Sequence, residues 1–218
     1  MKTIIALLTL AAASHGESLD FRGKRFSYLL YKPSPEVGER PAVLLLHGAG
    51  GVGRDMLDLW KPFAKSHGIV LIAPDLPREL AFEAIAPAFF KTLVDGINGI
   101  DRHRVYVFGY SMGGYLAFDA AMFGSGTFAA VGLYGNFISQ EYEGILKEAQ
   151  RKIPIAIYAG AKDELIPIAS VRATRDLLEA RGFPLRYREF PAVGHNYGVV
   201  AREVNADAWA FFEQVRLP

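Results

Sequence analysis

A strand that turns directly into a helix constrains the fold of this chain more than any other local feature. Residues 105–108 form an apolar run typical of a buried strand, and residues 113–123 have helical character. Between them lies Gly109-Tyr110-Ser111-Met112-Gly113, a G-x-S-x-G pattern. A strand, this pattern and a helix together predict a sharp turn that lifts Ser111 above a sheet edge, with Gly109 and Gly113 at positions too crowded for side chains.

Short apolar runs alternate with helical segments along the rest of the chain. The runs are apolar on both faces, which favours a mostly parallel sheet covered by helices on both sides. The sequence therefore predicts a single α/β, doubly wound domain. The expected strands are 26–31 (an edge strand), 42–46, 69–73, 105–108, 129–134, 155–159 and 185–190; the expected helices are 54–66, 78–97 (interrupted at Pro87), 113–123, 171–181 (closed by Gly182) and 205–214.

The length and charge of the chain limit its function classes. A chain of 218 residues suits one domain, and a net charge of +1 disfavours a general nucleic-acid surface. The chain has no cysteine, so it has no thiolate nucleophile or Cys-based metal site. His15, His67 and His103 show no metal-ligand spacing. We therefore expect neither a metal ion nor a cofactor.

The first residues are typical of a secretory signal. One lysine is followed by a short apolar stretch and then by Ala11-Ala12-Ala13, an A-x-A end. The stretch is too short for a stable membrane anchor. We expect residues 1–16 to be a signal peptide cleaved near Ala13 or a few residues later, residues 17–218 to form the domain, and the protein to be secreted or periplasmic. The alternative is that these residues form a first helix or strand of the fold.

A serine hydroxyl needs a base and an orienting acid to act as a nucleophile. Asp163 follows the expected strand 155–159, at the strand end where ligand-facing residues of open α/β sheets lie. Glu164 is a rival acid, but Asp163 is closer to the strand. His195 follows the last expected strand and is the only histidine after Ser111. The order Ser, Asp, His is the order of α/β-hydrolases, so Ser111, Asp163 and His195 are the candidate catalytic residues.

These segments carry a resemblance to a known family. The motifs H-G-x-G, G-Y-S-M-G-G, G-x-x-D-x-x-x-P and G-H-N resemble those of the α/β-hydrolase family, specifically its small carboxylesterases. Among these the chain is most similar to the secreted group of polyhydroxybutyrate-depolymerase-like and feruloyl-esterase-like proteins, with dienelactone hydrolases as neighbours. The resemblance covers essentially all of residues 17–218. It implies a serine ester hydrolase and does not identify a substrate.

The glycine-rich loop at residues 47–53 has two interpretations. Gly48, Gly50 and Gly53 match the dinucleotide-binding pattern G-x-G-x-x-G, with Asp75 after the next strand as a ribose-binding acid. That interpretation leaves the serine, acid and histidine unexplained. The resemblance implies instead that Ala49 donates one backbone N–H to an oxyanion. The second donor is the N–H of Met112, at the start of the helix after the serine. His47 is then a loop-shaping residue.

The substrate site is expected to be open. Only about twenty residues, 134–154, occupy the place where many α/β-hydrolases insert a cap domain. The expected substrate-binding residues are Gly50, Tyr110, Asn136 and Tyr197. The resulting hypothesis is a serine hydrolase that acts through an acyl-enzyme on small or polymer-displayed carboxylic esters. Two alternatives remain: a non-catalytic hydrolase-fold protein that binds a ligand or partner, and a peptidase of the prolyl-oligopeptidase type. The sequence does not indicate an oligomeric state.

Overall fold

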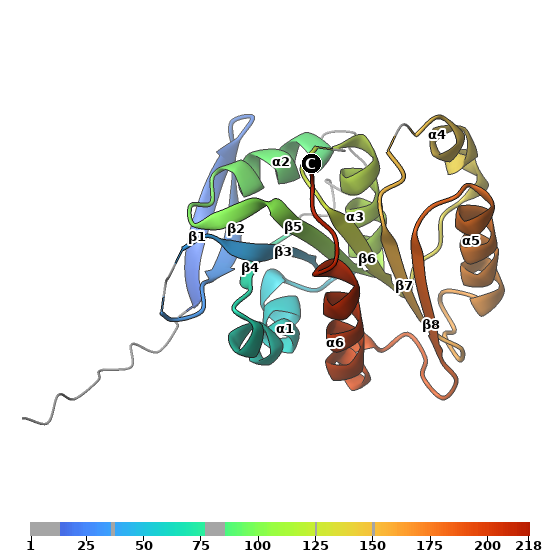
Figure 1. Cartoon of the computed structure of the whole chain (residues 1–218). Coiled ribbons are helices and arrows are strands. Elements are labelled where there is room, and N and C mark those ends of the chain that lie inside the picture. Colours follow the sequence, from blue (N-terminus) through green and yellow to red (C-terminus); the bar gives the residue numbers. More distant parts are fainter. Residues whose placement is uncertain (1–13, 36–37, 77–85, 125, 150) are drawn as a thin grey trace, which may run out of the picture.

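The computed structural model describes residues 14–35, 38–76, 86–124, 126–149 and 151–218, which form one sheet flanked by helices (Figure 1). The sheet has eight strands in the order β1-β2-β4-β3-β5-β6-β7-β8. The strands are β1 Ser14–Phe21, β2 Lys24–Tyr31, β3 Arg40–Leu46, β4 Val70–Pro74, β5 Ile100–Tyr110, β6 Ala130–Tyr134, β7 Ile155–Gly160 and β8 Leu185–Phe190.

Most neighbouring strands run parallel. The pairs β4–β3, β3–β5, β5–β6, β6–β7 and β7–β8 are parallel, whereas β2 pairs antiparallel with both β1 and β4. Parallel neighbours need long crossover connections, which helices supply on the two faces of the sheet. The predicted doubly wound, mostly parallel α/β sheet is confirmed.

The helices divide between the two faces of the sheet. α1 and α6 pack on one face and lie below the sheet in Figure 1, whereas α2, α3, α4 and α5 pack on the other. Their bounds are α1 Gly53–His67, α2 Ala86–Asp95, α3 Met112–Phe123, α4 Glu143–Glu148, α5 Ile168–Ala180 and α6 Ala201–Phe212, with short 3-10 helices at Gln140–Tyr142 and Tyr197–Val199. None of the helices in the described part of the chain combines the length and apolarity that crossing a bilayer requires.

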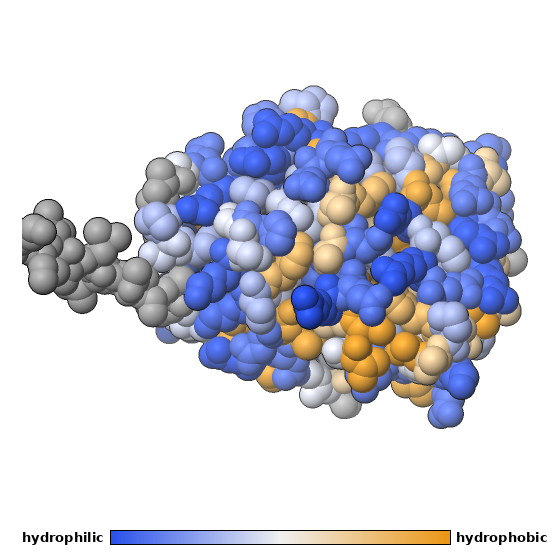
Figure 2. All heavy atoms as spheres, turned by 60° about the horizontal axis from the view of Figure 1, so that its bottom comes forward, coloured by the Kyte–Doolittle hydropathy of each residue, from blue (hydrophilic) through white to orange (hydrophobic). Residues whose placement is uncertain are grey.

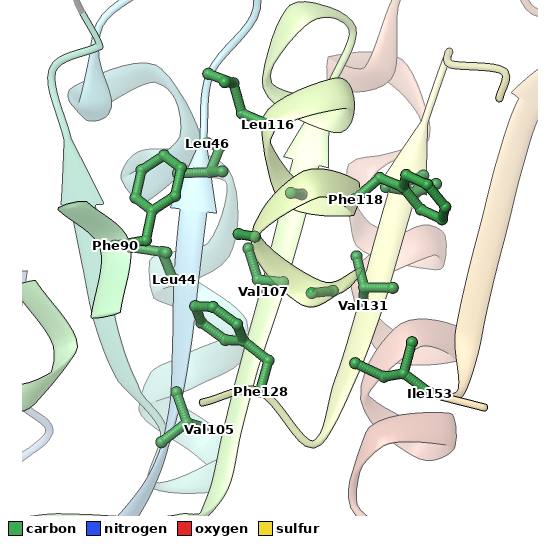
Figure 3. Close-up of a cluster of buried hydrophobic side chains, with 14 of the residues drawn as sticks. Leu44, Leu46, Phe90, Val105, Val107, Leu116, Phe118, Phe128, Val131 and Ile153 are labelled. Carbon is green, nitrogen blue, oxygen red and sulfur yellow. The ribbon is translucent and has the colours of Figure 1, made fainter. Parts of the chain in front are cut away.

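The central strands are buried on both faces, as their unbroken apolar runs predict. In β3, Leu44 and Leu46 point into one core cluster while Val43 and Leu45 point into the other, because successive side chains alternate across a strand. Figure 3 shows the first cluster, in which side chains of α2 and α3 fill the space above β3, β5 and β6. These two cores hold the carboxyl ends of the parallel strands in fixed positions.

The N-terminal part of the fold differs from the prediction. The expected edge strand 26–31 lies within β2, which is not an edge, because β1 pairs along its full length from Ser14↔Tyr31 to Phe21↔Lys24. The expected domain boundary after residue 16 therefore falls inside β1. Polar residues dominate β1, which is why its alternation was missed. Residues 1–13 of the expected signal lie outside the described residues.

Three other segments of the chain can be compared with the prediction. The expected helix 78–97 corresponds to α2; Pro87 lies in its first turn, where a missing N–H is tolerated, and residues 78–85 lie outside the described residues. The last helix begins at Ala201, four residues earlier than expected. Between β6 and β7 the described residues hold only the 3-10 helix Gln140–Tyr142 and α4, so no large cap lies there.

Candidate active site

The turn between β5 and α3 has the strained shape expected for the serine. Ser111 adopts φ 53° and ψ −120°, a region that non-glycine residues rarely occupy. A Cβ on Gly109 would lie 2.1 Å from the carbonyl oxygen of Gly113, and one on Gly113 would lie 2.3 Å from that of Leu46. Both positions therefore require glycine, as the G-x-S-x-G pattern predicts.

The end of β6 holds this strained turn in place. The Ser111 N–H donates to the carbonyl oxygen of Tyr134 at 2.9 Å. The Ser111 carbonyl oxygen accepts from the Gly114 N–H at 2.8 Å and from Nδ2 of Asn136 at 3.2 Å. Three hydrogen bonds thus fix the backbone of Ser111 on both sides of its Cα, so the surrounding structure sustains the unfavourable φ.

The three residues predicted from the sequence meet in one hydrogen-bonded chain. Nε2 of His195 lies 2.9 Å from Oγ of Ser111, and Nδ1 of His195 lies 2.7 Å from Oδ2 of Asp163. Both distances are normal for hydrogen bonds. Ser111, Asp163 and His195 follow β5, β7 and β8, so parallel pairing brings their carboxyl ends to the same edge of the sheet.

Asp163 is oriented by its own loop. Its second oxygen, Oδ1, accepts the N–H groups of Leu165 at 2.9 Å and Ile166 at 2.8 Å, and its side chain is 1% exposed. The carboxylate therefore presents Oδ2 to His195 and Oδ1 to the backbone. Glu164, the rival acid, is exposed to solvent.

His195 is held from three sides. The hydroxyl of Tyr110 donates to its carbonyl oxygen at 2.6 Å. A Cβ on Gly160 would lie 2.3 Å from the carbonyl oxygen of Val193, so the end of β7 packs directly against the loop that carries the histidine. Gly135, with φ +59°, lies under the ring: a Cβ there would be 3.0 Å from its Cε1. The side chain of His195 is still 14% exposed, which leaves it accessible to a small reactant.

Tyr110 stays protonated in this position. Burial, assisted by the nearby negative charge of Asp163, raises the pKa of its phenol. The hydroxyl is therefore a hydrogen-bond donor across the neutral pH range, which is the role that its bond to the His195 carbonyl requires.

The glycine-rich loop borders Ser111 and is shaped by His47. His47 is buried; its Nε2 accepts the N–H of Leu76 at 2.8 Å, so Nδ1 carries the proton and donates to the Gly48 carbonyl at 2.8 Å. A Cβ on Gly48 would lie 3.4 Å from Cβ of Ser111. The next residue, Ala49, is exposed. The structure thus supports the interpretation of His47 as a loop-shaping residue.

The remaining parts of the G-x-G-x-x-G pattern have structural roles. A Cβ on Gly53 would lie 2.3 Å from the Ala73 carbonyl oxygen, so this glycine lets α1 approach β4. Oδ1 of Asp75 accepts the Gly53 N–H at 2.8 Å, which caps the start of α1. Both residues are accounted for without a nucleotide.

Met112 is the first residue of α3. The first N–H groups of a helix have no acceptor within the helix, and the helix dipole adds partial positive charge there. The Met112 N–H is therefore well placed for an anionic oxygen. It lies one residue from Ser111, on a turn whose geometry is fixed.

The four expected substrate-binding residues fall into two groups. Gly50 is exposed with φ +76°, and Tyr110 is partly exposed beside His195. Asn136 and Tyr197 are each 1% exposed; Asn136 is enclosed by the structure, whereas Tyr197 contributes to the lining of a small pocket beside the glycine-rich loop. Asn136 holds the Ser111 carbonyl, and the hydroxyl of Tyr197 donates to Oδ1 of Asn205 within the core.

The contact of Gly135 with the His195 ring is not evident from the sequence. The clue was available in Tyr134-Gly135-Asn136, a glycine directly after a buried strand, but its contact with the histidine depends on how β6, β7 and β8 align. Among the described residues, no group of three or more His, Asp or Glu side chains could hold a metal ion.

Comparisons with known proteins identify the family. A model of the dienelactone hydrolase family matches residues 91–214. A solved structure of a thermostable esterase superposes with a TM-score of 0.74 at 21% identity, over 93% of this chain and 63% of that one. A poly(3-hydroxybutyrate) depolymerase from Bordetella parapertussis does so with a TM-score of 0.74 at 21% identity, over 95% and 92%.

A curated relative matches a shorter stretch. Acyl-protein thioesterase 1 of Gibberella zeae is 24% identical over 105 residues, which are 45% of this chain and 44% of the thioesterase. The chain thus spans less than half of that relative. The family match itself covers more than half of the chain and includes the serine turn, Asp163 and His195. The chain belongs to the dienelactone hydrolase family and shares its α/β fold with these solved structures.

Proposed function

We propose that this protein is a serine ester hydrolase that works through an acyl-enzyme intermediate. The observation that carries the proposal is the unbroken hydrogen-bonded chain from Oγ of Ser111 through His195 to Asp163. With Nδ1–H donated to Asp163, the lone pair of Nε2 faces the serine hydroxyl, which is the tautomer that a general base requires.

The first half of the reaction transfers the acyl group to the serine. Nε2 of His195 takes the hydroxyl proton as Oγ of Ser111 bonds to the ester carbonyl carbon, and the carbonyl electron pair moves onto its oxygen. The N–H groups of Ala49 and Met112 stabilise this oxyanion. When the carbonyl re-forms, the bond to the alcohol oxygen breaks, and that oxygen takes the proton from Nε2.

The second half repeats these steps with water. His195 takes a proton from water while the water oxygen attacks the acyl carbon, and then returns a proton to Oγ of Ser111 as the carboxylic acid leaves. Asp163 keeps the imidazole oriented and stabilises its protonated form throughout. No step needs a metal ion or cofactor.

The proposed substrates are small esters or esters displayed on a polymer. Their support is the short segment between β6 and β7, where the described residues form only one short 3-10 helix and α4. A site without a large cap admits an ester attached to a bulky body. An amine leaving group must be protonated more completely than an alcohol leaving group before its bond to carbon breaks. We therefore favour esters as substrates over the peptides of the prolyl-oligopeptidase alternative.

The test is hydrolysis of p-nitrophenyl acetate, butyrate and octanoate by the wild type and by Ser111→Ala. Removing a triad nucleophile is expected to lower kcat by several orders of magnitude. A folded wild-type protein with no activity above that of the variant on any of these esters would contradict the proposal and favour the non-catalytic binding role.

We further propose that residues 1–16 hold a secretion signal that is cleaved near Ala13 or a few residues later. The support is the composition of this segment, in which one lysine precedes a short apolar stretch and an A-x-A end. N-terminal sequencing of the exported protein tests it, and an exported or cell-retained chain that keeps Met1 would contradict it.

A further inference from the structure

A small pocket lies beside the candidate active site. Its volume is about 130 Å³, and its lining includes Ala49 of the glycine-rich loop, Tyr110 and Asn196. Tyr110 precedes Ser111 and Asn196 follows His195 in the chain. The pocket is therefore lined by the chain neighbours of both the serine and the histidine, and by the expected oxyanion donor itself.

This pocket borders a larger groove between α1 and α6. The groove has a volume of about 1010 Å³ and shares Leu59 and Gly198 with the small pocket. α1 and α6 lie side by side below the sheet in Figure 1. Figure 2 turns this side of the molecule toward the viewer, and hydrophobic surface is visible on it.

The walls of the groove are mainly apolar. Pro62 and Phe63 of α1 face Val199 and Val200 at the start of α6, and Val199 is 66% exposed. The charges along the groove are mixed, because Asp58 and Glu203 are acidic and Arg202 is basic. Such a lining fits an uncharged aliphatic chain better than an ionic group.

The floor of the groove is fixed before any ligand binds. Asn205 is fully buried; its Nδ2 donates to the Leu59 carbonyl at 3.0 Å, and its Oδ1 accepts the hydroxyl of Tyr197. These bonds tie α6 to α1 at the junction with the small pocket. A preformed groove binds a chain without the cost of ordering its own walls.

Stereochemistry indicates which part of the substrate lies there. In the tetrahedral intermediate the oxyanion points to the Ala49 and Met112 N–H groups, and the leaving oxygen must lie near Nε2 of His195 to receive its proton. The serine oxygen occupies a third position on the tetrahedral carbon, so the acyl chain points in the one direction that remains. A pocket between Ala49 and Asn196 therefore lies on the side of the leaving group.

We propose that the groove between α1 and α6 binds the alcohol part of the ester, and that this part is an uncharged, elongated aliphatic chain. The inference rests on the proposed function. It adds a specificity site to that reaction and narrows the substrates to esters of long-chain alcohols or to oligomeric esters, in which an alcohol end continues as a chain.

The experiment varies the alcohol and keeps the acyl group constant. Hydrolysis of ethyl, butyl and octyl acetate is followed by the released acid, and kcat/KM is compared. A methylene group that is half removed from water by the groove is expected to raise kcat/KM by a factor of about two. The six methylenes added between ethyl and octyl acetate should therefore raise kcat/KM roughly 60-fold. kcat is expected to change little where deacylation limits turnover, because the alcohol has already left.

Matched variants locate the effect in the groove. Val199→Asn replaces an exposed apolar side chain in the groove, and Phe123→Asn replaces one that is 56% exposed at the end of α3, outside the groove. Val199→Asn is expected to lower the octyl-to-ethyl ratio of kcat/KM on the order of fivefold, whereas Phe123→Asn leaves the ratio unchanged. Leu59→Trp, which narrows the junction, is expected to lower it further.

Three results would overturn the inference. The first is a kcat/KM that is independent of alcohol length; the second is an equal change of the ratio in the Val199 and Phe123 variants. A Val199 effect on the acyl series of p-nitrophenyl esters, with none on the alcohol series, would also overturn it by assigning the groove to the acyl group. Ester hydrolysis that depends on Ser111 in the same experiments shows that the proposed function stands even if the groove assignment fails.

Discussion

Replacing Gly135 by alanine tests whether the end of β6 positions His195, the proposed general base. Gly135 lies directly under the ring of His195, and an added Cβ would lie 3.0 Å from Cε1 and 3.2 Å from Nδ1. Contacts this short force the ring to move by a few tenths of an ångström. The same Cβ would lie 3.5 Å from Oδ2 of Asp163, an ordinary van der Waals contact, so the strain falls on the histidine and not on the acid.

The expected effect has two parts. The φ of +59° costs an alanine about 1–2 kcal/mol of stability, because its Cβ is crowded in that conformation. Displacement of the imidazole lengthens its bond to Oγ of Ser111 from 2.9 Å. A misplacement of about 1 Å costs roughly a hundredfold in rate, so we expect a shift of a few tenths of an ångström to lower kcat about tenfold.

Gly182→Ala is the matched control. Gly182 has φ +73°, and an added Cβ would have nothing within 4 Å, so the control carries the backbone cost without touching the site. Both variants are expected to lower the melting temperature by roughly 2–8 °C. Only Gly135→Ala is expected to lower kcat for p-nitrophenyl acetate. Equal kcat for the wild type and Gly135→Ala, or an equal loss in both variants, would refute the reasoning.

Three further predictions follow from single contacts. Asn136→Ala removes one of two donors to the Ser111 carbonyl and is expected to lower kcat about tenfold with KM nearly unchanged in steady-state kinetics; an effect on KM alone would contradict a positioning role. Asp163→Asn should lower kcat/KM by on the order of 10³–10⁴, because an amide does not hold the required tautomer, and a loss below tenfold would exclude that role. The hydrogen bond from Arg172 lowers the pKa of Glu189 to about 2, so its stabilisation is present above the ordinary value of 4.5 and is lost as the pH falls toward 2. Glu189→Gln should therefore reduce the free energy of unfolding by no more than about 1 kcal/mol at pH 7. That difference should shrink between pH 5 and pH 3 in urea titrations, and a difference that grows on acidification would contradict the assignment.

The elements that position the triad could be predicted because their signals are local. The apolar run of β5, the glycines at 109 and 113 and the order of Ser111, Asp163 and His195 each lie within a few residues of sequence. Parallel pairing then brings the ends of β5, β7 and β8 to one edge. This strand order places the three loops side by side, so that three side chains more than 30 residues apart in the chain form consecutive hydrogen bonds.

Burial of the aromatic and amide residues near the site was not predictable in the same way. Tyr197 follows the histidine and looks exposed in sequence, yet it packs against Tyr110 and Tyr134 with ring centroids 5.8 Å and 5.2 Å apart. Asn136 is a polar residue in a loop, yet the close approach of Gly114 encloses it. Both outcomes depend on how α3 and the β8–α6 connection meet, which a single sequence does not specify.

The strand β1 was missed for a related reason. Its residues Ser14–Phe21 are polar at most positions and exposed or half-buried, so they carry little of the apolar alternation that predicts strands. What places them in the sheet is the free edge of β2, with which they pair along eight positions. An edge strand of this kind is stabilised by backbone hydrogen bonds more than by a buried face.

Trapping of the acyl-enzyme tests the central claim most directly. The wild type is mixed with p-nitrophenyl acetate, quenched in acid within its first turnovers, and digested for mass spectrometry of the peptide that contains Ser111. The account predicts one added acetyl group on Ser111 in the wild type and none in Ser111→Ala. Rapid ester hydrolysis with no acetyl on Ser111 under any quench condition, or an acetyl group on another residue that persists in the Ser111 variant, would contradict it.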